Sequence, residues 1–165
     1  MLETKIPDSK ITSLLRQVII DNKDVWENIP PRNISKDLFL AKTIPNREEI
    51  SKFECGIQLS RDHENLLEVA DILGATEVRN SMVYYPMSMM GWHTNSDTTG
   101  KRIYYTFGVK ESIFRYRDPA SLRYINSYDN VGWTTREFLI SSTQPLWHCV
   151  WTEGIRFSFG FNRPL

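Results

Sequence analysis

The sequence lacks features that would assign it to several common classes of protein. No run of apolar residues in the 165-residue chain approaches the roughly 20 that a membrane-spanning helix needs. The first residues contain no apolar stretch followed by small residues, so we expect no secretory signal and a cytoplasmic location. Lysine plus arginine equals aspartate plus glutamate, at 20 each, so the basic excess typical of nucleic-acid-binding proteins is missing. We therefore expect neither a membrane nor a nucleic acid as partner.

Cysteine and histidine are both scarce. Cys55 and Cys149 lie far apart and form no CxxC pair, which argues against a disulfide framework or a zinc knuckle. We expect both to be buried apolar side chains in a reducing compartment. Of the three histidines, His63 opens a polar helical segment and is expected to be solvated. His93 and His148 are therefore the histidines most suited to carry chemistry.

The first half of the chain has helical patterns. Apolar residues recur at the three-four spacing of one helix face over residues 11–19, with Asp8 and Ser9 as candidate caps. Residues 62–73 have a wide apolar face, and Gly74 is placed to end that helix in a left-handed conformation. Both segments are predicted to be amphipathic helices.

Between these helices the short apolar run at residues 38–41 is predicted to be a strand, followed by a helix that Asn46 caps. Beyond residue 74 the pattern changes to short runs of β-branched and aromatic residues. Seven such runs are predicted strands: residues 82–85, 89–93, 102–108, 112–116, 137–140, 147–151 and 156–161. Residues 119–135 are predicted to be a long loop.

Helices that precede strands, rather than alternating with them, favour an antiparallel β unit with helices on one face. Seven short strands imply a sandwich or a barrel, so the fold class is mainly β within the α+β class. The length suits one domain over residues 1–165. In that domain residues 1–76 form a mostly helical support and residues 77–165 form the β core.

Candidate metal ligands gather at the end of the strand at residues 89–93. Alternate residues of a strand share a face, so His93 and Asn95 point the same way, as would Asp97 if the strand continued. His148 can meet them only across strands. Two histidines and one oxygen ligand leave three coordination positions open, which is the arrangement of non-haem iron(II) sites. A histidine in a strand is also commonly a hydrogen-bonded core residue.

Arg156 and Ser158 follow the second histidine and share one face of their strand. An inward-facing arginine is costly to bury unpaired, whereas its guanidinium can clamp a carboxylate with two parallel hydrogen bonds. A serine hydroxyl can add a third bond. A dicarboxylate ligand would satisfy this pair, and the alternative is a structural ion pair with an internal aspartate or glutamate.

With these residues, the second half resembles the iron(II)- and 2-oxoglutarate-dependent oxygenase superfamily, in its prolyl-hydroxylase-like and phytanoyl-hydroxylase-like branches. The shared motif is His-x-Asp/Glu, a distal His, and Arg-x-Ser. The residues Tyr85-Pro86 and Gly91-Trp92-His93 resemble the approach to the first ligand, and Gly100-Lys101-Arg102 with Ile103-Tyr104-Tyr105 resembles the next loop and strand. The resemblance covers about residues 84–162.

The resemblance implies a double-stranded β-helix, which is a cupin-like jelly roll, with N-terminal helices packed on one sheet. It implies an enzyme that uses iron(II), 2-oxoglutarate and dioxygen to hydroxylate a C–H bond of a small molecule or a peptidyl residue. His93 and His148 would bind iron, and Arg156 and Ser158 would bind the far carboxylate of 2-oxoglutarate. Tyr85 and Tyr104 would line the co-substrate pocket, or else be core aromatics.

The sequence departs from the motif at the third ligand, where Asn95 stands in place of an acid and the nearest carboxylate is Asp97. An amide oxygen is neutral and binds a dication more weakly than a carboxylate does. Three alternatives follow. Asp97 folds back to coordinate, Asn95 or water completes a weaker site, or the chain is a non-catalytic jelly roll that binds a carboxylate or a protein partner. A cupin-like enzyme with another metal is a further rival.

Overall fold

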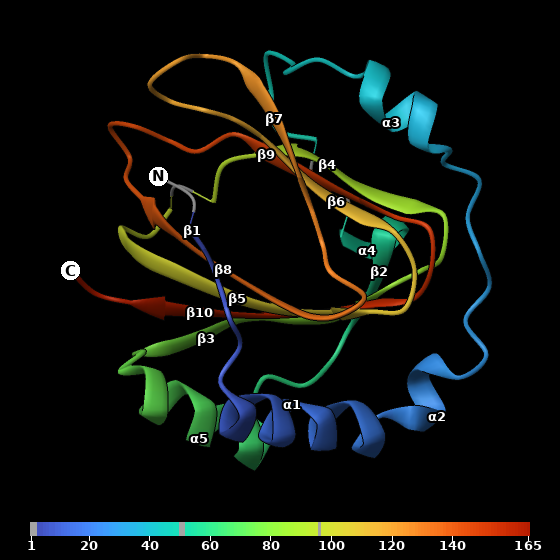
Figure 1. Cartoon of the computed structure of the whole chain (residues 1–165), viewed down its shortest axis with the longest axis vertical. Coiled ribbons are helices and arrows are strands. Elements are labelled where there is room, and N and C mark those ends of the chain that lie inside the picture. The colour runs from blue at the N-terminus through green and yellow to red at the C-terminus, as the bar shows by residue number, and fades with distance from the viewer. Residues whose placement is uncertain (1–2, 50–51, 96) are drawn as a thin grey trace.

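The chain forms two antiparallel β-sheets that face each other (Figure 1) in a computed structural model that describes residues 3–49, 52–95 and 97–165. The six-stranded sheet contains, in spatial order, β1 (Glu3–Lys5), β8 (Gly132–Ile140), β5 (Gly100–Gly108), β10 (Arg156–Arg163), β3 (Glu77–Tyr84) and β2 (Gly56–Gln58). The four-stranded sheet contains β4 (Ser88–His93), β9 (His148–Thr152), β6 (Ser112–Arg117) and β7 (Tyr124–Tyr128).

The order of the strands identifies the fold. From β3 to β10 the chain passes back and forth between the sheets, so that β3, β10, β5 and β8 are neighbours in one sheet and β4, β9, β6 and β7 are neighbours in the other. Every pairing in both sheets is antiparallel. This is a double-stranded β-helix, as predicted, and β1 and β2 extend the edges of its larger sheet.

Two helices cover the outer face of the six-stranded sheet, α1 (Ser9–Asp21) and α5 (Glu64–Leu73) (Figure 1). The Asp8 carboxylate accepts the backbone N–H groups of Lys10 and Ile11 at 2.9 and 3.1 Å, which caps α1 as expected. Gly74 ends α5 with a φ of 65°, in the left-handed region that glycine enters without steric cost. Both predicted helices are confirmed.

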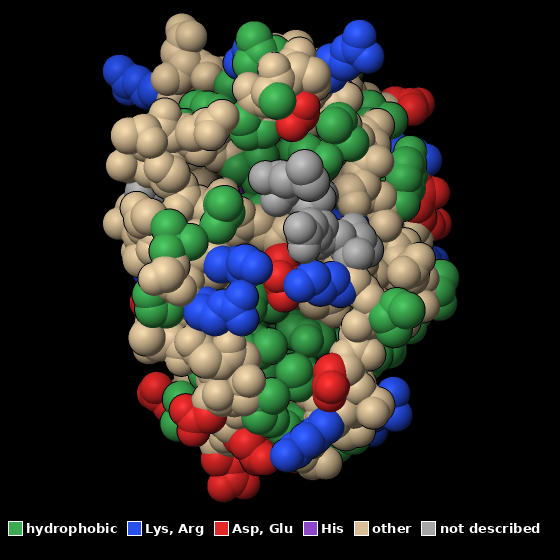
Figure 2. Space-filling view, turned by 60° about the vertical axis from the view of Figure 1, so that its left-hand side comes forward, with side chains coloured by type: hydrophobic (Ala, Val, Ile, Leu, Met, Phe, Trp, Pro, Cys, Tyr) green, Lys and Arg blue, Asp and Glu red, His purple; other side chains and the backbone are tan. Residues whose placement is uncertain are grey.

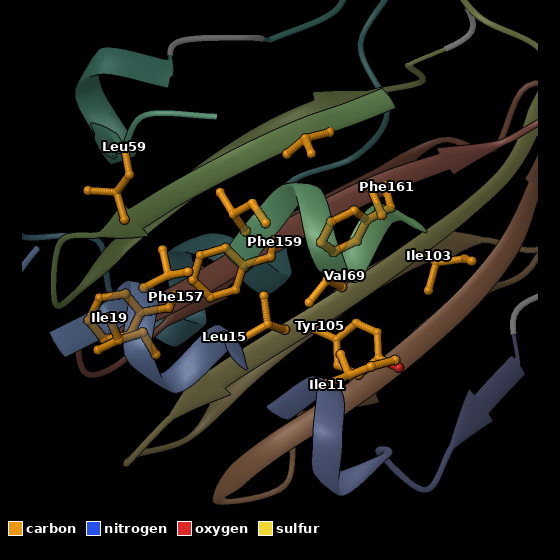
Figure 3. Packing of buried hydrophobic residues seen from close by; sticks show 14 of the residues in the cluster. Ile11, Leu15, Ile19, Leu59, Val69, Ile103, Tyr105, Phe157, Phe159 and Phe161 are labelled. Carbon is orange, nitrogen blue, oxygen red and sulfur yellow. The ribbon is translucent and has the colours of Figure 1, made fainter. Parts of the chain in front are cut away.

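The packing of these helices fixes which way β10 faces. Phe157, Phe159 and Phe161 of β10 are buried against α1 and α5 (Figure 3). Because side chains alternate along a strand, Arg156 and Ser158, which are next to these phenylalanines in the sequence, point to the other face of the sheet, into the space between the two sheets. Because the apolar face of β10 packs against the helices, its polar face points into the space between the sheets.

Three predictions about the first half of the chain were wrong. Residues 36–41 form the helix α3 (Lys36–Ala41) instead of a strand, and Ser35 caps it by accepting the N–H of Leu38 at 3.1 Å. A run of four apolar residues fits a helix as well as a strand, and here the cap decides. No helix begins at Asn46, since the described residues 46–49 have no regular structure. His63 is not simply solvated, because its side chain caps α5 and contacts Asp21 at 2.8 Å.

The remaining short helices are α2 (Lys23–Trp26) and α4 (Lys52–Cys55). Helix α3 packs through Phe39 on the outer face of the four-stranded sheet, against Trp92 and Trp151. Strand β7 lies inside the predicted loop of residues 119–135, at the edge of the four-stranded sheet. Most of its side chains are exposed, so it has no buried apolar face for the sequence to reveal.

The surface carries charges of both signs. Figure 2 shows lysine and arginine side chains on either side of acidic ones near the middle of one face. Lys5 and Lys101 both contact the carboxylate of Glu137, at 2.8 and 3.3 Å. No helix in the described part of the chain is long and apolar enough to cross a membrane.

Leu15 is the residue of α1 whose truncation should cost most. Its side chain is fully buried between α1 and the six-stranded sheet (Figure 3), so Leu15→Ala should lower the free energy of unfolding by about 2–5 kcal/mol. Ile20 on the same helix is 53% exposed, and Ile20→Ala should change it by less than about 0.5 kcal/mol. Urea unfolding of both variants measures the difference. Equal losses would contradict the packing described.

Candidate metal and carboxylate site

A pocket lies between the two sheets, and most of the predicted site residues line it. They come from four strands and one loop: His93, Asn95, Tyr104, His148, Arg156 and Ser158. Residues 93 and 148 are direct partners across the β4–β9 ladder. The two histidines, 55 positions apart in the sequence, are therefore brought together by strand pairing, as the sequence analysis required.

The two imidazoles are held in the same way. Their ring centroids are 4.1 Å apart, and the residues are 4% and 2% exposed. His93 Nδ1 lies 2.7 Å from the carbonyl oxygen of Gly91, and His148 Nδ1 lies 2.9 Å from that of Leu146. A carbonyl oxygen can only accept, so each Nδ1 carries the hydrogen, and in the neutral ring Nε2 keeps its lone pair. Metal-binding histidines are commonly oriented by such a bond.

His148 stays neutral at ordinary pH. Burial, followed by the neighbouring His93 and then Arg102, holds the pKa of His148 well below its usual value. Neutral imidazole is the form that binds metal ions. The site therefore needs no deprotonation of His148 before a cation binds.

Of the two candidate oxygen ligands, Asn95 is the one beside the imidazoles. β4 ends at His93, and Asn95 follows in a left-handed conformation with a φ of 51°. Its Nδ2 lies 3.2 Å from His148 Nε2. A half-turn of the amide would exchange Nδ2 for Oδ1. Asp97 is 60% exposed and instead contacts Arg79 Nη2 at 2.5 Å.

No three side chains of histidine, cysteine, aspartate or glutamate gather around a possible metal position within residues 3–49, 52–95 and 97–165. The donor set that the described residues offer is two imidazoles and the Asn95 amide. Imidazole nitrogens and an amide oxygen can bind a dication. Because this donor set carries no negative charge, it should hold the dication less tightly than a set that includes a carboxylate.

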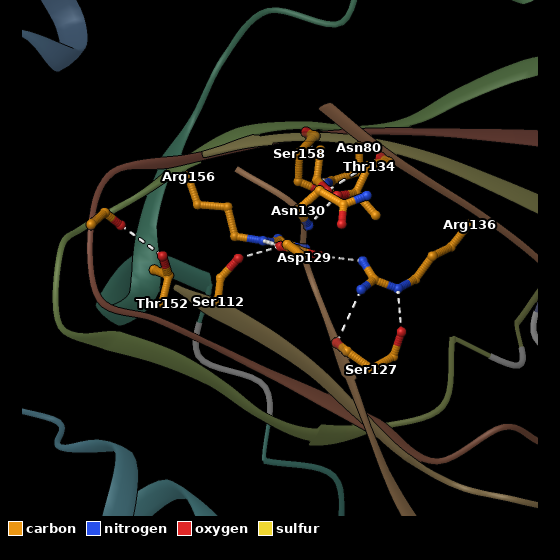
Figure 4. Close-up of polar contacts among 12 residues, drawn as sticks. Asn80, Ser112, Ser127, Asp129, Asn130, Thr134, Arg136, Thr152, Arg156 and Ser158 are labelled. Carbon is orange, nitrogen blue, oxygen red and sulfur yellow. Dashed lines mark hydrogen bonds and ion pairs between the residues drawn. The ribbon is translucent and has the colours of Figure 1, made fainter. Parts of the chain in front are cut away.

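Arg156 has an internal carboxylate partner (Figure 4). Its Nε donates to Asp129 Oδ2 at 2.8 Å, and the side chains of Arg156 and Asp129 are 2% and 4% exposed. Asp129 also forms an ion pair with Arg136 and accepts a hydrogen bond from Ser112. Burial alone would raise the pKa of Asp129, but the guanidinium groups of Arg156 and Arg136 lower it far below its ordinary value.

The buried charges around the pocket do not balance. Four arginines line it, and three of them, Arg102, Arg136 and Arg156, are each 2% exposed or less. Asp129 supplies one buried carboxylate against them. Three positive charges and one negative charge leave an excess of two positive charges. An unbalanced buried charge is costly, so the pocket is suited to an anion.

The aromatic lining differs from the prediction at one position. Tyr104 lines the pocket, but Tyr84 does so in place of Tyr85. In the β3–β10 ladder Tyr84 is the partner of Arg156, so it shares the inner face, whereas the ring of Tyr85 packs under the guanidinium of Arg32 at 4.2 Å. Ser158 Oγ accepts a hydrogen bond from Asn80 Nδ2 at 3.2 Å.

Three further charged residues of the site were missed from the sequence. Arg102 had a detectable signal, because it alternates with Tyr104 along a predicted strand and so shares its face. Arg136 lies just before the predicted strand at residues 137–140, because β8 begins earlier, at Gly132. Asp129 lies in the segment predicted to be a loop, where no periodicity indicates direction.

Comparison with known proteins supports the fold. No protein-family model matches the chain, and no curated protein matches it. Among solved structures, the chain is similar to a prolyl-4-hydroxylase from Pseudomonas putida, with a TM-score of 0.51 and 13% sequence identity. The match covers 98% of this chain and 92% of that one. A likeness at this identity shows a shared fold.

Asp129 should make the free energy of unfolding depend strongly on pH in the acid range. Asp129→Asn leaves Arg136 and Arg156 without their buried counter-charge and should lower the free energy of unfolding by about 3–5 kcal/mol at neutral pH. Because the pKa of Asp129 is lowered on folding, its contribution is complete above about pH 5 and declines as the pH falls through and below the unfolded value of about 4.

Denaturant unfolding at a series of pH values measures this contribution. Wild type should lose more stability than Asp129→Asn between about pH 5 and pH 3. Asp71→Asn, which changes an exposed aspartate of α5, is the matched control and should follow the wild-type curve. Parallel curves for wild type and Asp129→Asn would contradict the assigned role.

Proposed function

We propose that the protein is an iron(II)- and 2-oxoglutarate-dependent oxygenase that hydroxylates a C–H bond of a small molecule or a peptidyl residue. One observation carries the proposal. Two imidazoles with fixed Nδ1–H groups lie in one pocket with an inward-facing arginine, between the sheets of a double-stranded β-helix. The fold likeness to a protein described as a prolyl-4-hydroxylase supports the same class.

His93, His148 and Asn95 would hold the metal. The two Nδ1–H bonds to backbone carbonyls keep the rings from turning, so both ligand nitrogens are oriented before the metal arrives. With three protein ligands, positions remain open for a co-substrate and dioxygen. Bound iron(II) with 2-oxoglutarate supplies the oxidising power for hydroxylation, and the pocket supplies orientation and exclusion of water.

The charge of the pocket fits the co-substrate. 2-Oxoglutarate is a dianion at neutral pH, and the positive charge of the pocket, together with that of a bound dication, would favour its binding. Arg156 and Ser158 would bind the carboxylate far from the metal, with Tyr104 beside them. Asp129 already fixes Arg156 through Nε, so it would hold the guanidinium in place for that contact.

Asn95 supports one rival function, a jelly roll that binds a carboxylate without catalysis. The rival differs in its dependence on metal. Protein purified without oxygen should form succinate from 2-oxoglutarate when iron(II) is added, even without a substrate, if it is the oxygenase. Binding of 2-oxoglutarate with no metal uptake and no succinate would favour the rival.

The identity of the third ligand can be tested with manganese(II) as a probe for iron(II). Asn95→Asp introduces a charged oxygen ligand and should raise manganese(II) affinity at least about tenfold, which is about 1.4 kcal/mol. Asp97→Ala should change the affinity little, because Asp97 contacts Arg79 instead of the imidazoles.

Titration calorimetry or electron paramagnetic resonance measures the affinity, and His148→Ala provides the negative control because it removes one imidazole. A loss of manganese(II) binding in Asp97→Ala would reject Asn95 as the third ligand. Unchanged binding in His148→Ala would reject the metal site altogether.

A further inference from the structure

Arg102 is a buried cation whose hydrogen-bonding capacity is largely unused. It lies on β5, lines the pocket between the sheets, and is 1% exposed. Its Nε and Nη1 have no hydrogen-bond partner among the described residues. A buried donor without an acceptor costs free energy, and more so when the group is charged. Such a cost is tolerated most readily where a ligand relieves it.

The contacts that Arg102 does make are weak. Nη2 lies 3.4 Å from the backbone oxygen of Asn95 and 3.8 Å from the carboxylate of Asp97. Asp97 is more closely bound by Arg79, at 2.5 Å, and is 60% exposed. The Asp97 charge is thus shared with another cation and with solvent.

Arg102 and Arg156 lie at opposite ends of the pocket. In the β5–β10 ladder the partner of Arg102 is Asn162, and the partner of Arg156 is Gly108. The two arginines are therefore six positions apart along the sheet, which at about 3.3 Å per residue is about 20 Å between their backbones. Arg102 is at the end with the imidazoles, since its nearest contact is Asn95, which itself contacts His148. It is not placed to share the far carboxylate with Arg156.

Asn95 contributes to the unbalanced charge at this end. An aspartate or glutamate at residue 95, as in the related motif, would bring a negative charge to the loop whose backbone Arg102 contacts. The neutral amide brings none. The end of the pocket with the imidazoles thus contains a guanidinium with two unpartnered nitrogen atoms and an uncharged set of possible metal ligands, and both favour an incoming anion.

We propose that Arg102 binds a carboxylate of the substrate itself, so that the substrate is a small carboxylic acid, such as a free amino acid, rather than an internal residue of a peptide. This rests on the proposed oxygenase function and narrows its substrate class. A guanidinium with free donors matches a carboxylate in shape and charge. An internal peptide residue has no carboxylate at its backbone, because its carboxyl group is in an amide bond.

Binding to metal-free protein tests the carboxylate site independently of turnover. The probes are the standard free L-amino acids and short straight-chain carboxylic acids, and the amide of each acid is its control. Thermal unfolding screens the probes for binding, and titration calorimetry then measures the affinity. At least one acid should stabilise wild type while its amide does not. In Arg102→Gln the affinity for that acid should fall at least about tenfold. Lys101→Gln is the matched control, because Lys101 is the adjacent cation but contacts Glu137 instead of lining the pocket.

A second pair of measurements separates this site from the co-substrate site. With manganese(II) present, Arg156→Gln should weaken 2-oxoglutarate binding strongly, whereas Arg102→Gln should change it by less than about twofold. Without any ligand, Arg102→Gln should unfold at a higher temperature than wild type, because it removes an uncompensated buried charge. That result would also show that the variant folds.

Three results would overturn the proposal. One is that no acid among the probes binds wild type, and another is that Arg102→Gln binds the acid as well as wild type does. The third is that Arg102→Gln loses 2-oxoglutarate as strongly as Arg156→Gln, which would assign Arg102 to the co-substrate. Absence of iron-dependent succinate formation would reject the oxygenase and leave the metal-free binding result unaffected, so the two failures are distinguishable.

Discussion

The buried carboxylate of Asp129 is the interaction on which the interior of this protein depends. It pairs with Arg136 of β8 and Arg156 of β10 in one sheet and accepts a hydrogen bond from Ser112 of β6 in the other. Two buried guanidinium groups on the same face of one sheet would otherwise repel each other and lack a counter-charge. Through these contacts and the one to Ser112, Asp129 connects the two sheets and fixes the side chain of Arg156.

The buried guanidinium groups therefore have partners at one end of the pocket and lack some of them at the other. At the end that contains Arg156, Arg156 and Arg136 share the counter-charge of Asp129, and Arg136 also donates to Ser127. At the end with the imidazoles, Arg102 lacks partners for two of its nitrogen atoms. A fold selected for stability alone would pair or remove such a cation. This asymmetry fits the carboxylate site proposed for Arg102.

The Asn95 position relates the charge of the pocket to the metal site. Two histidines are oriented by backbone carbonyls, and the third side chain beside them is neutral. In the metal site proposed above, this neutral amide would hold a metal less tightly than a carboxylate and would leave the pocket more positive, which favours anionic ligands. Asparagine in place of an acid at residue 95 is thus expected to weaken metal binding and to strengthen anion binding.

The sequence by itself determined the helices that begin after Asp8 and end at Gly74, the β core, and the shared inward face of Arg156 and Ser158. These follow from caps and from period-two alternation, which act within one element. Only the tertiary structure decided that residues 36–41 are helical, that β7 lies within the expected loop, and that Asn95 rather than Asp97 is beside His148. It also decided that Asp129 is the partner of Arg156. Alternation fixes which residues of a strand share a face, but not which strands pair or where a loop returns, and those depend on contacts between distant parts of the chain.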